Sequence, residues 1–267
     1  MRRIPDAIKP QHPSTSSPTM NASASESFPR LLTTFAGWGG ALALVAGALY
    51  FGNSSASESA VKIPVAAVDD TAGAGSMQTA VFAGGCFWGV QGVFQRVQGV
   101  SQAVSGYSGG KAATAKYEMV TSGLSGHAEA VKITYDPKKV SYATLLQIYF
   151  SVAHDPTQLN RQDPDVGPQY RSAVFYGDAA QKATTEKYIA QLDAAKAWRS
   201  KIVTQVVPLE AFYAAEAYHQ DYLTLNPTQG YIVRFDLPKI ANLKTMFPQQ
   251  YRAEPALVMA KAGKAPQ

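Results

Sequence analysis

The spacing of apolar and polar residues changes repeatedly along residues 79–223 between the two-residue period of strands and the 3.6-residue period of helices. A glycine-rich loop at 105–110 and a polar loop at 154–169 interrupt the pattern. Strands that alternate with helices predict an α+β fold, a two-layer sandwich in which helices pack against one mixed sheet. Strands are predicted over 79–83, 128–135, 171–176 and 202–207, and helices over 88–97, 141–152, 178–198 and 209–223.

A different pattern precedes this region. Residues 1–30 are rich in Ser, Pro, Ala and Thr, and we expect a polar, disordered N-terminal region. Residues 31–52 carry no charge, and their apolar part, 35–52, would span about 27 Å as a helix, close to the ~30 Å hydrocarbon core of a bilayer. Basic residues precede this segment, which predicts a cleaved signal peptide or an uncleaved signal anchor, with the rest of the chain outside the cytoplasm, on the periplasmic side. Residues 53–77 are predicted to be a flexible linker.

The amino-acid composition excludes several classes of protein and of binding site. Hydrophobic residues make up 46% and charged residues 16% of the 267, as in a globular protein. The net charge of +5 comes from 24 basic and 19 acidic residues without a long basic run, which argues against a nucleic-acid partner. Cys86 is the only cysteine, so the chain forms no internal disulfide and no multi-cysteine zinc or iron–sulfur site.

Cys86 lies where a predicted strand gives way to a helix. Gly84 and Gly85 allow a sharp turn at this point. The helix N-terminus that follows favours negative charge, so we expect a lowered pKa for the thiol and a reactive thiolate. These residues alone leave a buried, inert cysteine as an alternative. Phe87 and Trp88 either join the core or line an apolar pocket for a small methyl-bearing group.

Six short motifs occur in order along the chain. Together they resemble the peptide methionine sulfoxide reductase A family over residues 78–250, which leaves 251–267 as a predicted disordered tail. The resemblance implies a ferredoxin-like core and thiol-dependent reduction of methionine S-sulfoxide, in proteins and free, as a repair of oxidised proteins. The motifs are Gly-Cys-Phe-Trp-Gly at 85–89, Tyr-Ser-Gly-Gly at 107–110, Gly-His-Ala-Glu-Ala-Val at 126–131, His-Asp-Pro-Thr-Gln at 154–158, Gln-Tyr-Arg-Ser at 169–172 and Tyr-His-Gln-Asp-Tyr at 218–222.

The resemblance also assigns the catalytic chemistry. It implies that Cys86 attacks the sulfoxide sulfur and that Glu129 protonates the sulfoxide oxygen. It implies an assisting role for Asp165, with the neighbouring Asp163 as an alternative. An acid that is still protonated near neutral pH is needed because sulfoxide oxygen is a poor leaving group. Burial among apolar groups raises the pKa of a carboxyl and supplies such an acid.

The resemblance further implies how the substrate is held. Tyr117 and Tyr170 are expected to donate hydrogen bonds to the oxygen as negative charge develops on it. Phe87 and Trp88 are expected to enclose the ε-methyl group of the substrate.

No bound cofactor or metal is expected. His127, His154 and His219 lack metal-ligand spacing, and we expect His127 and His219 to pack or to form hydrogen bonds. The reaction leaves Cys86 as a sulfenic acid, and the chain has no second cysteine to resolve it. The reductant is therefore expected to be an external thiol: a thioredoxin-like protein, the glutathione system, or dithiothreitol in vitro. The other expected partners are oxidised proteins or peptides, and the membrane if residues 31–52 are not cleaved; a monomer is expected.

Two other functions fit part of the pattern. A one-cysteine thiol peroxidase would also leave Cys86 as a sulfenic acid, but it needs an arginine near the thiolate, where this chain has aromatic residues and glycine. A non-enzymatic module could bind methionine-rich peptides through Phe87 and Trp88 without an ionised thiol. Alkylation of Cys86 separates these functions, because it abolishes the enzymatic activities and leaves peptide binding.

Overall fold

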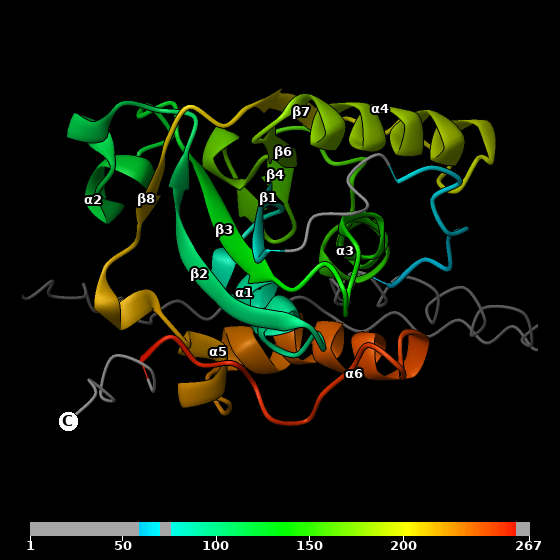
Figure 1. Ribbon diagram of the computed structural model, residues 1–267. Coiled ribbons are helices and arrows are strands. Elements are labelled where there is room, and N and C mark those ends of the chain that lie inside the picture. Colours follow the sequence, from blue (N-terminus) through cyan, green and yellow to red (C-terminus); the bar gives the residue numbers. More distant parts are fainter. Residues whose placement is uncertain (1–58, 70–75, 260–267) are drawn as a thin grey trace, which may run out of the picture. The chain divides into compact units, whose positions relative to one another are not determined.

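The computed structural model describes residues 59–69 and 76–259, which form strands and helices in alternation (Figure 1). The strands are β1 Gln78–Ala83, β2 Val100–Ser108, β3 Ala128–Tyr135, β4 Arg161–Gln162, β5 Asp165–Val166, β6 Ala173–Tyr176, β7 Gln205–Pro208 and β8 Phe212–Ala214. The helices are α1 Phe87–Gln95, α2 Tyr117–Val120, α3 Tyr142–Ile148, α4 Ala179–Ala194, α5 Tyr222–Leu225 and α6 Leu237–Met246, with π-helical turns at Tyr149–Ala153 and Ile232–Asp236.

Six of the strands form one curled sheet in the order β7-β6-β1-β3-β2-β8. Strands β6 and β7 are parallel and the other neighbouring pairs are antiparallel, so the sheet is mixed. The four central strands, joined through α1 and α3, follow the β-α-β-β-α-β order of connections. The predicted α+β class and mixed sheet are therefore confirmed.

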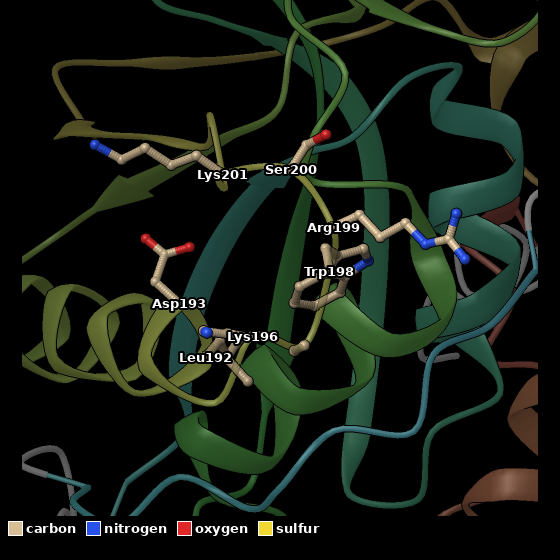
Figure 2. Close-up of a pocket in the computed structure, with 8 residues that line it drawn as sticks. Leu192, Asp193, Lys196, Trp198, Arg199, Ser200 and Lys201 are labelled. Atoms are coloured by element: carbon tan, nitrogen blue, oxygen red, sulfur yellow. The ribbon is translucent and has the colours of Figure 1, made fainter.

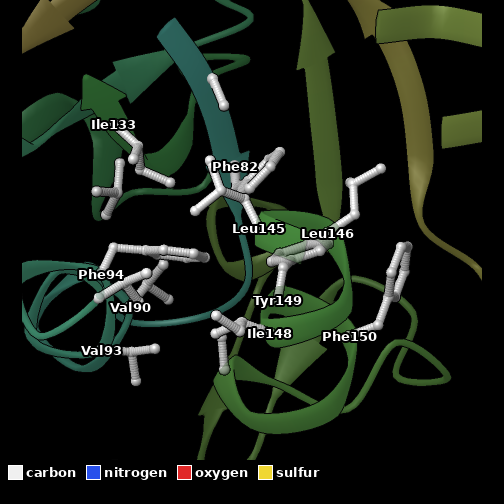
Figure 3. Packing of buried hydrophobic residues seen from close by; sticks show 14 of the residues in the cluster. Phe82, Val90, Val93, Phe94, Ile133, Leu145, Leu146, Ile148, Tyr149 and Phe150 are labelled. Atoms are coloured by element: carbon white, nitrogen blue, oxygen red, sulfur yellow. The ribbon is translucent and has the colours of Figure 1, made fainter. Parts of the chain in front are cut away.

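The main core lies on the face of the sheet that carries the helices (Figure 3). The ring of Phe82 in β1 lies 5.6 Å from that of Phe94 in α1 and 4.9 Å from that of Tyr149, the residue directly after α3, measured between centroids. Because successive strand residues point to opposite faces, Val81 and Ala83 belong to a smaller cluster on the other face. The strand that leads to Cys86 is thus buried on both sides.

Two helix starts follow from capping residues that the sequence shows. Ser141 accepts a hydrogen bond from the Thr144 backbone N–H at 3.1 Å and begins α3. Asp178 accepts one from the Gln181 N–H at 2.8 Å and begins α4. Side-chain acceptors at these positions satisfy backbone donors that a helix leaves free.

The helix predicted over 209–223 is wrong. This segment holds β8, a 3-10 turn at Ala217–His219 and the start of α5, with Asp221 in the left-handed region at φ 60°. The side chain of Gln220 explains the break: its amide donates to the backbone oxygens of Ser105 and Ala215. The bond to Ala215 is local, and local side-chain bonds compete with helix formation, while the bond to Ser105 holds Gln220 against β2. The pattern also missed β2 and α6.

Described parts of the predicted linker and tail lie on the domain. Within the predicted linker 53–77, residues 59–69 lie on the domain: Ile63 is buried in the core, and the Val61 N–H donates to the Ser151 oxygen at 3.0 Å. Within the predicted tail, Arg252 donates to the backbone oxygens of Gln95 and Val100. The error has one cause, because a few anchoring contacts order a segment whose overall composition is that of a linker.

The predicted regions 1–30 and 31–52 lie outside the described residues. Across 59–69 and 76–259, no helix combines the length and the apolar character needed to cross a bilayer.

Candidate active site

The chain turns from β1 into α1 within two glycines. Gly85 has φ +85°, a conformation that favours glycine. Both glycines are also packed too closely for a side chain: a Cβ at Gly84 would lie 2.9 Å from His154 Cγ, and one at Gly85 would lie 2.6 Å from Gln162 Cγ. The tight turn places Cys86, a half-buried residue, at the N-cap of α1.

Glu129 faces this helix end from β3. Its residue is 3% exposed, and its Oε2 accepts a hydrogen bond from the Phe87 backbone N–H at 3.0 Å. The carboxyl therefore takes up one of the free donors of the first helical turn, directly after the thiol. Burial raises the pKa of Glu129 to about 8, although the Phe87 bond opposes the shift. Glu129 is thus mostly protonated at neutral pH.

The expected fall in the pKa of Cys86 is wrong. Burial raises the pKa of this thiol, and the nearby carboxyls of Glu129, Asp236 and Asp165 raise it further. The backbone N–H of Trp88 favours the thiolate but does not outweigh these effects. A helix N-terminus stabilises an anion by a small amount, whereas desolvation and like charges act on the thiolate together.

A cavity of about 150 Å³ opens at the thiol. It contains all seven residues predicted for catalysis and substrate binding, together with a tyrosine that the motifs did not indicate. The lining residues are Cys86, Phe87, Trp88, Tyr117, Glu129, Asp165, Tyr170 and Tyr231.

Asp165 is fixed in this cavity by the unexpected tyrosine. The Tyr231 hydroxyl donates a hydrogen bond to Asp165 Oδ2. Burial raises the pKa of Asp165, and the Tyr231 bond opposes that shift. The alternative residue, Asp163, lies outside the cavity, where its half-exposed carboxylate pairs with Arg161. The geometry therefore favours Asp165 over Asp163.

Aromatic groups hold Trp88 in place. Its indole stacks on Tyr222 with centroids 3.9 Å apart and an interplanar angle of 12°, and Tyr231 meets it edge-on at 6.1 Å. The indole N–H donates to His219 Nδ1 at 3.2 Å.

His127 also forms a hydrogen bond: its Nδ1 accepts from the Gly110 backbone N–H at 3.2 Å. The packing and hydrogen-bonding roles expected for both histidines are confirmed.

Tyr117 depends on a residue that the sequence did not single out. Glu216 accepts a bond from the Tyr117 backbone N–H at 3.0 Å and another from the Tyr107 hydroxyl at 2.8 Å. Burial, then the charge of Glu129, raises the pKa of both Tyr117 and Tyr170. These two phenols remain protonated donors at neutral pH.

A larger cavity lies elsewhere, at the C-terminal end of α4 (Figure 2). Its volume is about 660 Å³, and none of the motif residues lines it. Lys196, Trp198, Arg199 and Lys201 contribute to its wall, without a buried acid or a thiol. The small cavity at Cys86, in contrast, combines a thiol with a buried carboxyl.

Comparison with known proteins agrees with this site. A family model described as peptide methionine sulfoxide reductase matches residues 78–251. The chain belongs to this family. Peptide methionine sulfoxide reductase A enzymes are oxidoreductases that return methionine S-sulfoxide to methionine and so repair oxidised proteins, and this chain is an enzyme of that kind.

Individual relatives cover the same region. The chain is 60% identical to peptide methionine sulfoxide reductase MsrA 2 of Mesorhizobium japonicum over 193 residues, which is 72% of this chain and 98% of the relative. Among solved structures, reduced Mxr1 of Saccharomyces cerevisiae superposes with a TM-score of 0.53 at 33% identity, covering 58% of this chain and 88% of that one. Methionine sulfoxide reductase A of Corynebacterium diphtheriae gives 0.50 at 30% identity, covering 65% and 90%.

Proposed function

We propose that Cys86 is the nucleophile and Glu129 the acid of the reduction. The Cys86 sulfur attacks the sulfoxide sulfur, the substrate S–O bond breaks, and an S–O bond forms at Cys86. Methionine sulfur gains two electrons and Cys86 sulfur loses two, which leaves methionine and a sulfenic acid. The observation that carries this assignment is the 150 Å³ cavity in which the thiol, the buried carboxyl and two phenols meet.

The proton balance follows from the two raised pKa values. At neutral pH the thiol of Cys86 and the carboxyl of Glu129 both retain their protons in the free enzyme. Glu129 gives its proton to the sulfoxide oxygen as the S–O bond weakens, and it recovers one when Cys86 loses its own. The pair therefore returns to its starting charge, and no ion has to enter the cavity.

Tyr117 and Tyr170 stabilise the oxygen while it carries negative charge. Both hydroxyls belong to the lining of the cavity and stay protonated in the working pH range. Fixed donors of this kind act more strongly in a site that excludes water than in solution. The Asp165–Tyr231 pair completes the polar side of the cavity.

Phe87 and Trp88 form the apolar side and take the methyl group. The stacking of Trp88 on Tyr222 and its bond to His219 fix the indole before substrate binds. A pre-formed wall loses little conformational freedom on binding.

The second half of the cycle depends on an external thiol. Cys86 is the only cysteine, so the sulfenic acid reacts with one thiol to a mixed disulfide and water, and a second thiol releases Cys86. A thioredoxin-like protein or the glutathione system fits this requirement, with dithiothreitol as the substitute in vitro. Substrates are oxidised proteins, peptides and free methionine sulfoxide, and the enzyme acts as a monomer.

We also propose that the catalytic domain lies outside the cytoplasm. The uncharged stretch 31–52, preceded by basic residues, supports export or anchoring with the catalytic domain on the periplasmic side. Fractionation of cells that express the full chain tests this, because a tag at residue 267 is then accessible to protease only from the outer side of the inner membrane.

A single-turnover assay tests the proposed chemistry. Pre-reduced protein is mixed with a peptide that contains methionine S-sulfoxide or R-sulfoxide, and methionine is counted. We expect one equivalent per chain from the S-epimer without added thiol, and many turnovers with dithiothreitol. The absence of product in both cases, with Cys86 still alkylatable, contradicts the proposal.

A further inference from the structure

A buried ion pair lies against the first turn of the active-site helix. Asp236, with a side chain 0% exposed, and Lys239, 8% exposed, place Oδ1 and Nζ 3.5 Å apart. Across residues 59–69 and 76–259, neither Asp236 oxygen has a hydrogen-bond partner. A buried carboxylate with so few donors is costly to the fold. This position therefore calls for a function that an apolar side chain would not supply.

Gly89 brings the pair to the active site. A Cβ at this residue would lie 2.1 Å from Asp236 Oδ1 and 3.2 Å from Lys239 Nζ. Only glycine leaves room for the carboxylate beside the backbone of α1, three residues after Cys86. Figure 1 shows α6, which carries Lys239, running beside α1. The last glycine of the Gly-Cys-Phe-Trp-Gly motif is thus explained by the ion pair and not by a turn.

The pair acts on its surroundings through charge. Ionised Asp236 raises the pKa of Cys86, after burial and Glu129, and it raises the pKa of Glu129, after burial and Asp165. Burial raises the pKa of Asp236 itself to about 6, a shift that Lys239 opposes, so the carboxyl is mostly ionised at pH 7. The titratable or charged groups that interact with one or both members of the pair are Cys86, Glu129, His154, Asp165 and Tyr231.

Building on the proposed function, we propose that Asp236 and Lys239 are positioning residues that set where the protons of the site reside. The Asp236 carboxylate, held against Gly89, keeps the protons on Cys86 and Glu129 until substrate binds. Lys239 limits this effect. The resting thiol then reacts slowly with other electrophiles, while the acid remains ready to protonate a sulfoxide.

Alkylation of the single cysteine measures this directly. The rate of reaction of Cys86 with iodoacetamide is followed against pH in the full chain. At pH 7.5, Asp236→Asn is expected to react about tenfold faster, since removal of one nearby negative charge favours the thiolate. At pH 9, where Asp236 is ionised, Lys239→Met is expected to react several times more slowly, because the carboxylate then acts unopposed. The double variant Asp236→Asn/Lys239→Met is expected to react faster than the natural protein and more slowly than Asp236→Asn, because the carboxylate acts on the thiol more strongly than the ammonium does.

The direction in which each variant changes the alkylation rate distinguishes an effect of charge from a structural effect. A loosened site would expose the thiol and speed alkylation in all three variants, whereas the charge effect gives opposite signs for the two single variants. Equal rates in all proteins, or faster reaction in all three variants, overturn the proposal. The exposed pair Lys182 and Glu186 on α4 provides the control, because Lys182→Met/Glu186→Gln should leave the rate unchanged.

A second measurement tests the effect of the Asp236 charge on Glu129. In single-turnover reduction, Asp236→Asn is expected to lose activity at lower pH than the natural enzyme, because Glu129 then gives up its proton earlier. An unchanged pH profile overturns the proposal. The alkylation assay contains no sulfoxide, so failure of the natural protein to release methionine counts against the proposed function alone.

Discussion

The two sides of the catalytic cavity are built in different ways. On one side, Cys86 and Glu129 are placed by regular structure: β1 pairs with β3 along its length, and a two-glycine turn leads into α1. On the other side, Tyr231 belongs to the segment 216–259, which holds α5, α6, a 3-10 turn and a π-helical turn and which side-chain hydrogen bonds attach to the domain. Backbone pairing fixes the reacting atoms, and side-chain anchoring fixes the groups around them.

Asp221 illustrates the second mode. Its carboxylate accepts bonds from the Gln95 side chain at 2.6 Å and from the backbone N–H groups of Val258 and Met259 at 3.0 and 2.9 Å. One buried side chain thus joins α1 to the end of the described chain. Removing such an anchor should loosen this side of the cavity and leave the reacting pair in place.

Among the changes that compare the two sides, the largest effect is expected where both sides act on the same oxygen. Tyr117 is attached through Glu216 to the second side, whereas Tyr170 belongs to the turn before β6. Tyr117→Phe and Tyr170→Phe alone should each slow single-turnover reduction about tenfold, and the double variant should slow it by about 10²–10³-fold, because either phenol can partly replace the other. Rates of methionine release check this. A double variant no slower than the slower single variant contradicts shared stabilisation.

A smaller effect, on the free energy of unfolding, is expected to differ between Gly85 on the first side and Gly230 on the second. Gly85→Ala forces a left-handed φ on alanine and places its Cβ against Gln162, so the free energy of unfolding should fall by about 1–3 kcal/mol. Gly230→Ala is the matched control, because no atom lies within 4 Å of its added Cβ. Denaturant unfolding measures both. Equal losses at the two positions contradict the comparison.

The smallest effect on catalysis is expected at the anchor. Asp221→Ala leaves buried donors unsatisfied and should lower the free energy of unfolding by about 1–3 kcal/mol, while the rate of methionine release per folded molecule changes less than about threefold. Glu186→Ala, which removes an exposed carboxylate on α4, should cost at most about 0.5 kcal/mol. A large rate loss in Asp221→Ala with natural stability would show that the anchor positions the reacting atoms.

Much of the first side could be predicted from the sequence. The strand-turn-helix pattern around Cys86 has strong local signals, and all seven residues predicted from the family resemblance line one cavity. Tyr231 was missed because it lies in a region without strand or helix periodicity. Glu216 was missed because it lies in the segment 209–223, which was wrongly predicted to be a helix. The only local signal for Tyr231 was an aromatic residue next to Gly230, after the Asn226-Pro227 turn.

The electrostatics of the site could not be predicted from the sequence. A helix N-terminus beside Cys86 is a local feature, and it indicated a lowered pKa. Burial of the thiol reverses this direction, and carboxyls from β3, β5 and the start of α6 add to the rise in its pKa. Only the folded chain buries the thiol and brings these carboxyls together. Gly89 shows the same limit, because its need for glycine arises from Asp236, which is distant in the sequence.

The pH dependence of single-turnover reduction tests the role of the buried acid most directly. The folded pKa of Glu129, about 8, lies above the ordinary value of 4.5, so the proton it donates is present below pH 8 and is lost as the pH rises through that value. The account predicts that methionine release from the S-sulfoxide declines above pH 8, and that Glu129→Gln reduces it by about 10²–10⁴-fold with the fold intact. Release by Glu129→Gln at the natural rate, with the same decline above pH 8, would contradict it.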